Sequence, residues 1–186
     1  MLLCSARGSD PNATFRLNPG RQRRSLSLGL GNGVMWADEF LEKADAKGVV
    51  CRVLARVYGW PETALVGAYS CFVKSVTFNA KKRLYFQGVD PKKLTEAGDF
   101  VLICGGRDSV LLDIFLIPWI NFFQTLREGK PINTYHPPRR EYWQYKFRII
   151  DLSGRWALSV PGRSAPPIDV TAWRLDVGAA IERLRS

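Results

Sequence analysis

Apolar and polar positions follow two different periods along this chain, and from residue 36 onward they predict a mixture of helices and strands. In residues 36–46 the apolar side chains recur at spacings of three and four, with charged residues between them, which predicts an amphipathic helix. Residues 49–57 fit either a second helix or a strand, and their β-branched start favours the strand. Residues 60–62, Trp-Pro-Glu, then interrupt the pattern as a turn does.

A β-hairpin is the next element that the pattern predicts. Residues 69–78 and 84–89 are both strand-like, and the segment between them is polar and basic, with Lys81, Lys82 and Arg83 in a row. We therefore expect two paired strands with a positively charged turn.

The second half of the chain continues with strands and short helices. Residues 100–104 form a continuous apolar run between glycines, which is typical of a central strand covered on both faces. A strand at 113–117 and a helix at 118–126 follow, because proline is tolerated in the first turn of a helix. Alternation at 144–149 predicts a strand with one cationic face, and 177–184 predicts a terminal helix. The fold class is α/β, with a mixed central β-sheet flanked by helices.

Charge adds a class of partner to this picture. The 186 residues contain 27 Lys and Arg against 17 Asp and Glu, a formal net charge of +10, which favours a polyanionic partner. Residues 1–33 are basic and lack apolar periodicity, so we expect a disordered arm that either clamps a nucleic-acid backbone or is sequence upstream of a start at Met35. Residues 34–186 are expected to form a single α/β domain.

Several function classes are disfavoured by what the sequence lacks. Four separated cysteines and one histidine do not make a structural zinc site, and free thiols in a reducing cytoplasm are expected instead. The apolar runs are shorter than the ~20 residues that a membrane-spanning helix needs. No phosphate-binding glycine loop or GxSxG motif is present. A cytoplasmic protein without membrane contact is the expectation.

The order of elements resembles a known superfamily over about residues 36–127. A helix is followed by a strand containing Phe72-Val73-Lys74, by Ala97-Gly98-Asp99-Phe100 at the start of a strand, and by Ile117-Pro118-Trp119 before a helix. This order resembles the restriction-endonuclease-like, or PD-(D/E)XK, superfamily. The resemblance implies a restriction-endonuclease-like core and, in an active member, Mg²⁺ held by carboxylates beside a lysine that orients water.

Carried over to this sequence, the resemblance implies a catalytic site around two residues. Lys74 matches the motif lysine, Glu62 matches the first carboxylate, and Glu39 or Glu42 supplies another acid for the metal. Phe72 stands where the motif has its second carboxylate, and a phenyl ring does not bind metal.

Each of these candidates also has an ordinary structural interpretation. Lys74 is equally well explained as a solvated lysine on an edge strand, Glu62 as a turn residue, and Glu39 as part of the wet face of a helix. Asp90-Pro91-Lys92 is a literal DXK sequence, but its proline disfavours a central strand.

Two basic clusters are candidates for nucleic-acid contact. The first is the turn with Lys81, Lys82 and Arg83, and the second combines aromatic residues with cations over 135–148. Rings and cations together suit stacking on bases and contact with phosphates. A half-buried strand with solubilising charges explains the second cluster equally well. Its candidate cations are Arg139, Arg140, Lys146 and Arg148.

These observations predict a nucleic-acid-binding protein with a nuclease-like fold and a degenerate metal site, with DNA favoured over RNA. An active Mg²⁺-dependent endonuclease and a protein-interaction module without nucleic-acid binding are the alternatives. Mg²⁺ is expected only in the nuclease, and a homodimer is left open by the sequence.

Overall fold

The computed structural model describes residues 36–57, 59–136 and 139–185, and the arm predicted at 1–33 lies outside them. Within these ranges the chain forms two β-sheets and three α-helices.

The first sheet is mixed. Its neighbours pair antiparallel except β3 and β5, which run parallel because the chain leaves the sheet between them. In spatial order its six strands are β1 (Cys51–Val57), β2 (Trp60–Val66), β3 (Tyr69–Thr77), β5 (Phe100–Arg107), β6 (Val110–Pro118) and β11 (Arg174–Leu175).

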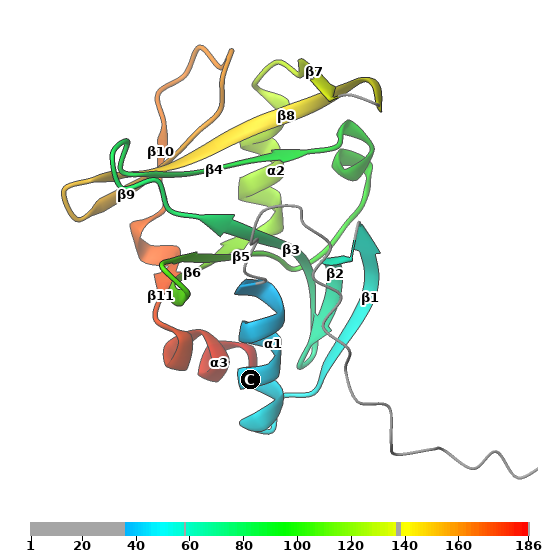
Figure 1. Cartoon of the computed structure of the whole chain (residues 1–186), viewed down its shortest axis with the longest axis vertical. Coiled ribbons are helices and arrows are strands. Elements are labelled where there is room, and N and C mark those ends of the chain that lie inside the picture. The colour runs from blue at the N-terminus through cyan, green and yellow to red at the C-terminus, as the bar shows by residue number, and fades with distance from the viewer. Residues whose placement is uncertain (1–35, 58, 137–138, 186) are drawn as a thin grey trace, which may run out of the picture. The chain divides into compact units, whose positions relative to one another are not determined.

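The second sheet is antiparallel and is built mostly from the C-terminal half of the chain. It has β10 (Ile168–Asp169), β9 (Arg155–Ser159), β8 (Arg139–Leu152) and β4 (Leu84–Val89) in spatial order, while β7 (Ile132–His136) pairs with β8. Figure 1 shows β4 and β8 crossing above the first sheet.

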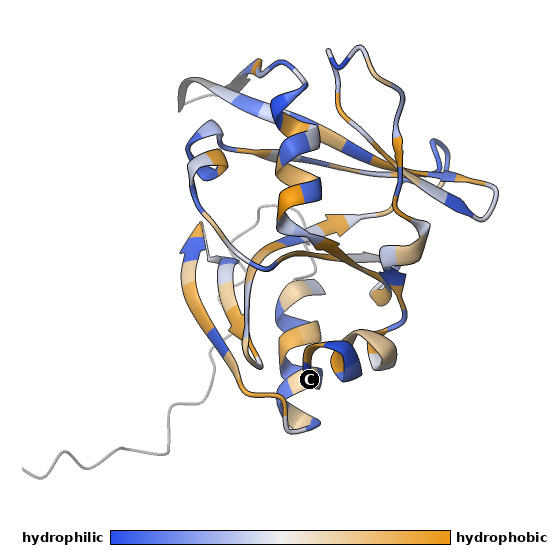
Figure 2. Cartoon of the chain, turned by 180° about the vertical axis from the view of Figure 1, so that it is seen from behind, coloured by the Kyte–Doolittle hydropathy of each residue, from blue (hydrophilic) through white to orange (hydrophobic). Residues whose placement is uncertain are grey.

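Helices cover both faces of the first sheet. On one face lie α1 (Trp36–Ala46) and α3 (Val177–Arg185); on the other lie α2 (Trp119–Arg127) and the second sheet. Figure 2 shows α2 from behind, with hydrophobic and hydrophilic residues alternating along it. Short 3₁₀ helices, η1 (Pro91–Thr95) and η2 (Thr171–Trp173), complete the connections. In the described part of the chain, no helix has the length and apolar character needed to cross a membrane.

Two adjacent glycines in β5 allow close packing on both faces of the first sheet. A Cβ at Gly105 would lie 2.6 Å from the Tyr85 ring, and one at Gly106 would lie 2.6 Å from the Trp36 ring. Such distances are far inside van der Waals contact. The absence of side chains here therefore admits Tyr85 from the second sheet and Trp36 from α1.

Most of the predicted elements are confirmed. The helix at 36–46, the strand choice at 49–57, the covered central strand at 100–104 and the helix after Pro118 all occur, as does the alternation in β8. Of the described cysteines, Cys51, Cys71 and Cys104 are free thiols, and the last two are buried. Burial raises the pKa of Cys71 to about 12.

The predicted pairing of 69–78 with 84–89 is wrong. β3 has β2 on one side and β5 on the other, so neither of its edges is free, and β4 pairs with β8 in the second sheet. A single bridge between Asn79 and Leu84 is all that remains of the hairpin. The explanation of Lys74 as an edge-strand residue is wrong for the same reason.

The turn predicted at 60–62 is also wrong, because these residues begin β2. Pro61 is accommodated because β1 and β2 change register beside it, and proline is tolerated where a sheet ladder is irregular.

Candidate nucleic-acid interface

The candidate interface is the face of the second sheet turned away from the first, which we call the outer face. Along β4 and β8, side chains alternate between the shared core and this face: Tyr85, Val89, Phe147 and Ile149 are buried between the sheets. The outer face is formed by Leu84, Phe86 and Gly88 on β4, by Gln144, Lys146, Arg148, Ile150 and Leu152 on β8, and by Arg155, Ala157 and Ser159 on β9.

An exposed ring and two cations lie together near the middle of the outer face. Phe86 is directly opposite Arg148, and Gly88 is directly opposite Lys146. The Phe86 side chain is 48% exposed, and the Lys146 ammonium lies 5.7 Å from the centre of its ring. This separation is within the range of a cation–π interaction.

Lys146 is held close to the sheet. Its ammonium donates to Oε1 of Gln144, and both side chains lie over Gly88, where a Cβ would come 3.0 Å from the Lys146 nitrogen. Partial burial lowers the pKa of Lys146 below its usual value. An ammonium that has lost part of its water shell gains from an anionic ligand.

The acids near this face are already paired. Asp169 binds the guanidinium of Arg155 at 2.9 Å, and Asp151 binds that of Arg83 at 2.6 Å. Among the described residues, no carboxylate pairs with Lys146 or Arg148 within salt-bridge distance. The outer face therefore keeps uncompensated positive charge beside its exposed ring.

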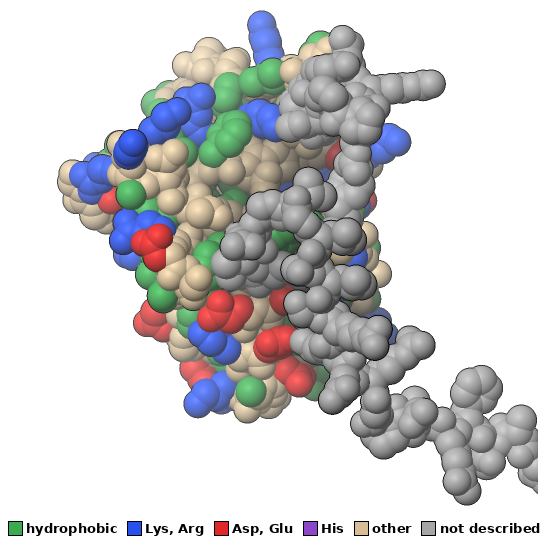
Figure 3. Space-filling model, viewed as in Figure 1, with side chains coloured by type: hydrophobic (Ala, Val, Ile, Leu, Met, Phe, Trp, Pro, Cys, Tyr) green, Lys and Arg blue, Asp and Glu red, His purple; other side chains and the backbone are tan. Residues whose placement is uncertain are grey.

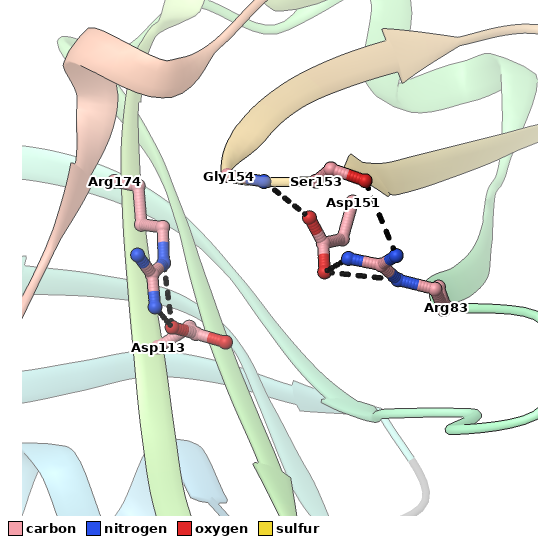
Figure 4. Close-up of polar contacts among 6 residues, drawn as sticks. All are labelled: Arg83, Asp113, Asp151, Ser153, Gly154 and Arg174. Atoms are coloured by element: carbon pink, nitrogen blue, oxygen red, sulfur yellow. Dashed lines mark hydrogen bonds and ion pairs between the residues drawn. The ribbon is translucent and has the colours of Figure 1, made fainter.

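The basic turn between β3 and β4 is fixed to the turn between β8 and β9. Arg83 has a left-handed backbone with φ of 51°, its carbonyl accepts from the Asp151 amide at 2.9 Å, and its guanidinium binds Asp151 and Ser153 (Figure 4). The Gly154 amide also donates to Asp151, and these contacts lower the pKa of that carboxyl.

Of the three cations predicted in this turn, Arg83 thus has a structural partner, whereas Lys81 and Lys82 are exposed. Arg139 and Arg140 lie at the start of β8, but their side chains fall outside the described part.

Charges are unevenly distributed over the face that Figure 3 draws. Figure 3 shows Lys and Arg gathered on the part formed by the second sheet, and Asp and Glu gathered lower, around α1. The acids of α1 and its end are Asp38, Glu39, Glu42 and Asp45.

The residues predicted for a metal site are partly brought together. Lys74 on β3 is half-buried, and its ammonium lies 4.8 Å from the centre of the Phe72 ring. Burial lowers the pKa of Lys74, and the Glu62 carboxylate partly opposes this effect, so the two side chains are within electrostatic reach of each other.

Glu62 itself is paired with another lysine. Its carboxylate lies 3.0 Å from the ammonium of Lys93 in η1, and Lys93 also binds Glu96 at 2.7 Å. Glu39 pairs with Lys43 one turn along α1, at 2.7 Å. In the described ranges, no three His, Cys, Asp or Glu side chains are grouped so that they could hold a metal ion.

Phe72 occupies the place that the motif gives to an acid, and it is part of the core. Its side chain is fully buried and contacts the rings of Trp119 and Phe123 edge-on, at centroid distances of 6.0 and 5.7 Å. The site beside Lys74 is therefore lined by rings on this side.

Asp113 is a notable residue to which sequence reasoning gave no role. It is 5% exposed on β6, accepts from the Tyr85 hydroxyl at 2.5 Å, and binds Arg174 at 2.7 Å (Figure 4). The signal available was a single acid within the apolar run 110–118. A buried carboxylate needs such partners, and this one joins the two sheets.

A groove of about 630 Å³ lies elsewhere, between β6 and α3. Its wall is mostly apolar, with Phe100, Leu116, Trp173 and Leu175, and Glu182 and Arg183 also line it. It contains none of the predicted site residues.

Comparisons with family models, with curated proteins and with solved structures found no match to this chain.

Proposed function

We propose that this chain binds nucleic acid, with DNA as the first ligand to test, through the outer face of the second sheet. The observation that carries the proposal is the grouping of exposed Phe86 with Lys146 and Arg148 on an open antiparallel face, where the nearby acids pair with other arginines. The exposed Lys81 and Lys82 extend the positive charge beyond the end of β4.

The physical basis is phosphate contact. Each phosphate that a lysine or arginine neutralises releases counterions, so the logarithm of the affinity falls linearly with the logarithm of the salt concentration. An interface made of apolar contacts responds little to salt. Salt dependence therefore separates this proposal from a protein-interaction role.

The test compares two charge reversals of equal size. Arg148→Glu removes a cation from the outer face, and Lys47→Glu removes an exposed cation at the end of α1; each lowers the net charge from +10 to +8. We expect Arg148→Glu to weaken DNA binding in a mobility-shift titration. The slope of log affinity against log salt concentration should become shallower by ~0.7–0.9, the change expected for the loss of one phosphate contact. Lys47→Glu is expected to leave both nearly unchanged.

Equal effects of the two reversals would mean that net charge alone drives binding, and the outer face would lose its role. Absence of salt-sensitive binding by the original protein would overturn the proposal altogether and leave a protein-interaction role.

A second candidate function is Mg²⁺-dependent DNA cleavage by a restriction-endonuclease-like core. What supports it is the electrostatic interaction between Glu62 and Lys74, together with the order of α1, the β1–β2–β3 meander and a parallel β5. Incubation of plasmid DNA with Mg²⁺ or Mn²⁺ tests it, with Lys74→Ala as the control. Metal-dependent cutting that the variant loses would favour the nuclease, and binding without cutting would favour a degenerate site.

A further inference from the structure

We infer that the outer face takes single-stranded nucleic acid, with Phe86 stacking on an unpaired base while Lys146 and Arg148 contact the adjoining phosphates. This inference rests on the proposed function and specifies its ligand.

Phe86 presents its ring on the outer face of the second sheet, where the side chain is 48% exposed. The Lys146 ammonium lies 5.7 Å from the centre of this ring. A ring in this position offers a flat apolar surface that is ready for a planar partner.

Only some bases of a nucleic acid can reach such a ring with their flat faces. Bases in a duplex stack on one another and show only their edges in the grooves, whereas an unpaired base can turn its flat face outward. Stacking on Phe86 therefore selects unpaired bases. Lysine and arginine contacts with phosphate alone would bind both forms.

The two cations are spaced around the ring at distances that suit phosphates. Arg148 is the direct cross-strand neighbour of Phe86, and Lys146 is one pair further along the same face, opposite Gly88. Directly opposed side chains have Cβ atoms roughly 5 Å apart, and neighbours on one face of a strand lie roughly 7 Å apart. The separation of Lys146 and Arg148 is about the distance between successive phosphates of an extended nucleic-acid strand. A base stacked on Phe86 can therefore have its two flanking phosphates beside Lys146 and Arg148.

Gly88 provides a variant that moves one cation without removing it. A Cβ at this position would meet the Gln144 amide oxygen and the Lys146 ammonium, which are the ends of two flexible side chains. Gly88→Ala should therefore displace the Gln144 amide, and with it the Lys146 ammonium that is hydrogen-bonded to this amide, while the strand stays in place.

The experiment measures binding of the full chain to a fluorescein-labelled 20-nucleotide single strand and to the corresponding duplex by anisotropy. We expect the single strand to bind more tightly, and Phe86→Ala to weaken it by at least about fivefold, the loss that corresponds to one stacked base. Phe86→Trp should keep the affinity. Val110→Ala, a similarly exposed apolar residue on the first sheet, should not change it, and Gly88→Ala should weaken it.

A 2-aminopurine probe reports the stacking directly. Its fluorescence should be quenched on binding to the original protein and much less on binding to Phe86→Ala.

Two other results are distinguishable. If single strand and duplex bind equally, with the same salt dependence, and Phe86→Ala changes neither the affinity nor the quenching, the stacking inference is overturned while nucleic-acid binding stands. If neither form binds in a salt-sensitive way, the inference and the proposed function both fail.

Discussion

Asp113 links the two sheets through a single carboxylate, and replacing it measures how much this link contributes to stability. Asp113→Asn removes the negative charge that binds Arg174. It also replaces one of the two acceptor oxygens of the carboxylate with an NH₂ group, which is a donor. Because the residue is buried, the lost contacts are not replaced by water. We expect the free energy of unfolding to fall by about 2–3 kcal/mol, measured by urea denaturation.

Asp108→Asn is the matched control for this substitution. Asp108 also pairs with an arginine, Arg107 at 3.0 Å, but its side chain is 82% exposed, so the expected change is within about 0.5 kcal/mol. If the two variants lost equal stability, the buried link would contribute nothing beyond an ordinary surface pair.

Lys74 should make the stability of the protein depend on alkaline pH. Burial lowers the pKa of Lys74 below its usual value of 10.5, so the folded chain holds this proton more weakly than the unfolded chain. Stability therefore increases as the pH rises through the folded pKa toward 10.5. We expect Lys74→Met to raise the free energy of unfolding at pH 7, and this gain to shrink as the pH approaches 10.5.

Chemical denaturation at a series of pH values tests this expectation. Lys47→Met, at an exposed position, serves as the control and should show no such trend. A gain for Lys74→Met that stays constant with pH would show that the charge of Lys74 is not its cause.

At the scale of elements, local patterns predicted the type of most segments but not their partners. The helical periodicity of residues 36–46 and the continuous apolar run at 100–104 are both local features, and both elements were predicted correctly. The partner of β4 depends instead on β8, about 60 residues later, and no local pattern identifies it. β2 was missed because Pro61 suggested a turn, whereas the register change beside it accommodates the proline.

In the candidate site, too, local patterns predicted some residues but not the contacts between strands. The cations of β8 were predicted because residues 144–149 alternate along one strand. The position of Phe86 opposite Arg148 is a property of the register between β4 and β8, so the sequence did not associate the two. Asp113 was overlooked because its partners, Tyr85 and Arg174, are 28 and 61 residues away.

The basic turn between β3 and β4 should act as an additional phosphate contact. Lys81 and Lys82 are exposed on a turn that Arg83 fixes to the turn between β8 and β9. If the proposed function is correct, Lys81→Gln with Lys82→Gln makes the slope of log DNA affinity against log salt concentration shallower by up to ~1.4–1.8. This is the change expected for the loss of two phosphate contacts. Isothermal titration calorimetry at several salt concentrations measures this slope.

The same pair of substitutions at Lys43 in α1 and at Lys47, just after its end, removes equal charge outside the basic turn. A similar drop in slope for both pairs would assign the effect to net charge rather than to the turn.

At the scale of the whole described domain, the two sheets should unfold together. They share one apolar core, to which β3, β5 and β6 contribute from the first sheet and β4, β8 and β9 from the second. If either sheet unfolds, the apolar face of the other sheet loses the contacts that cover it. We therefore expect one cooperative unfolding transition. Far-UV circular dichroism and tryptophan fluorescence should give coincident urea curves, with Trp36 and Trp156 buried on opposite faces of the first sheet.

Two separated transitions would show that the second sheet is an independent unit. In that case Asp113→Asn should shift only one of them.

On the face drawn in Figure 3, the basic surface of the second sheet and the acidic surface around α1 contribute to an electric dipole moment directed from α1 toward the second sheet. In the field of a polyanion this moment exerts a torque. A molecule that drifts to within about a Debye length, ~8–10 Å in ordinary salt, is rotated before it touches its partner. If the proposed function is correct, many random collisions thereby become encounters in which the exposed ring of β4 arrives first.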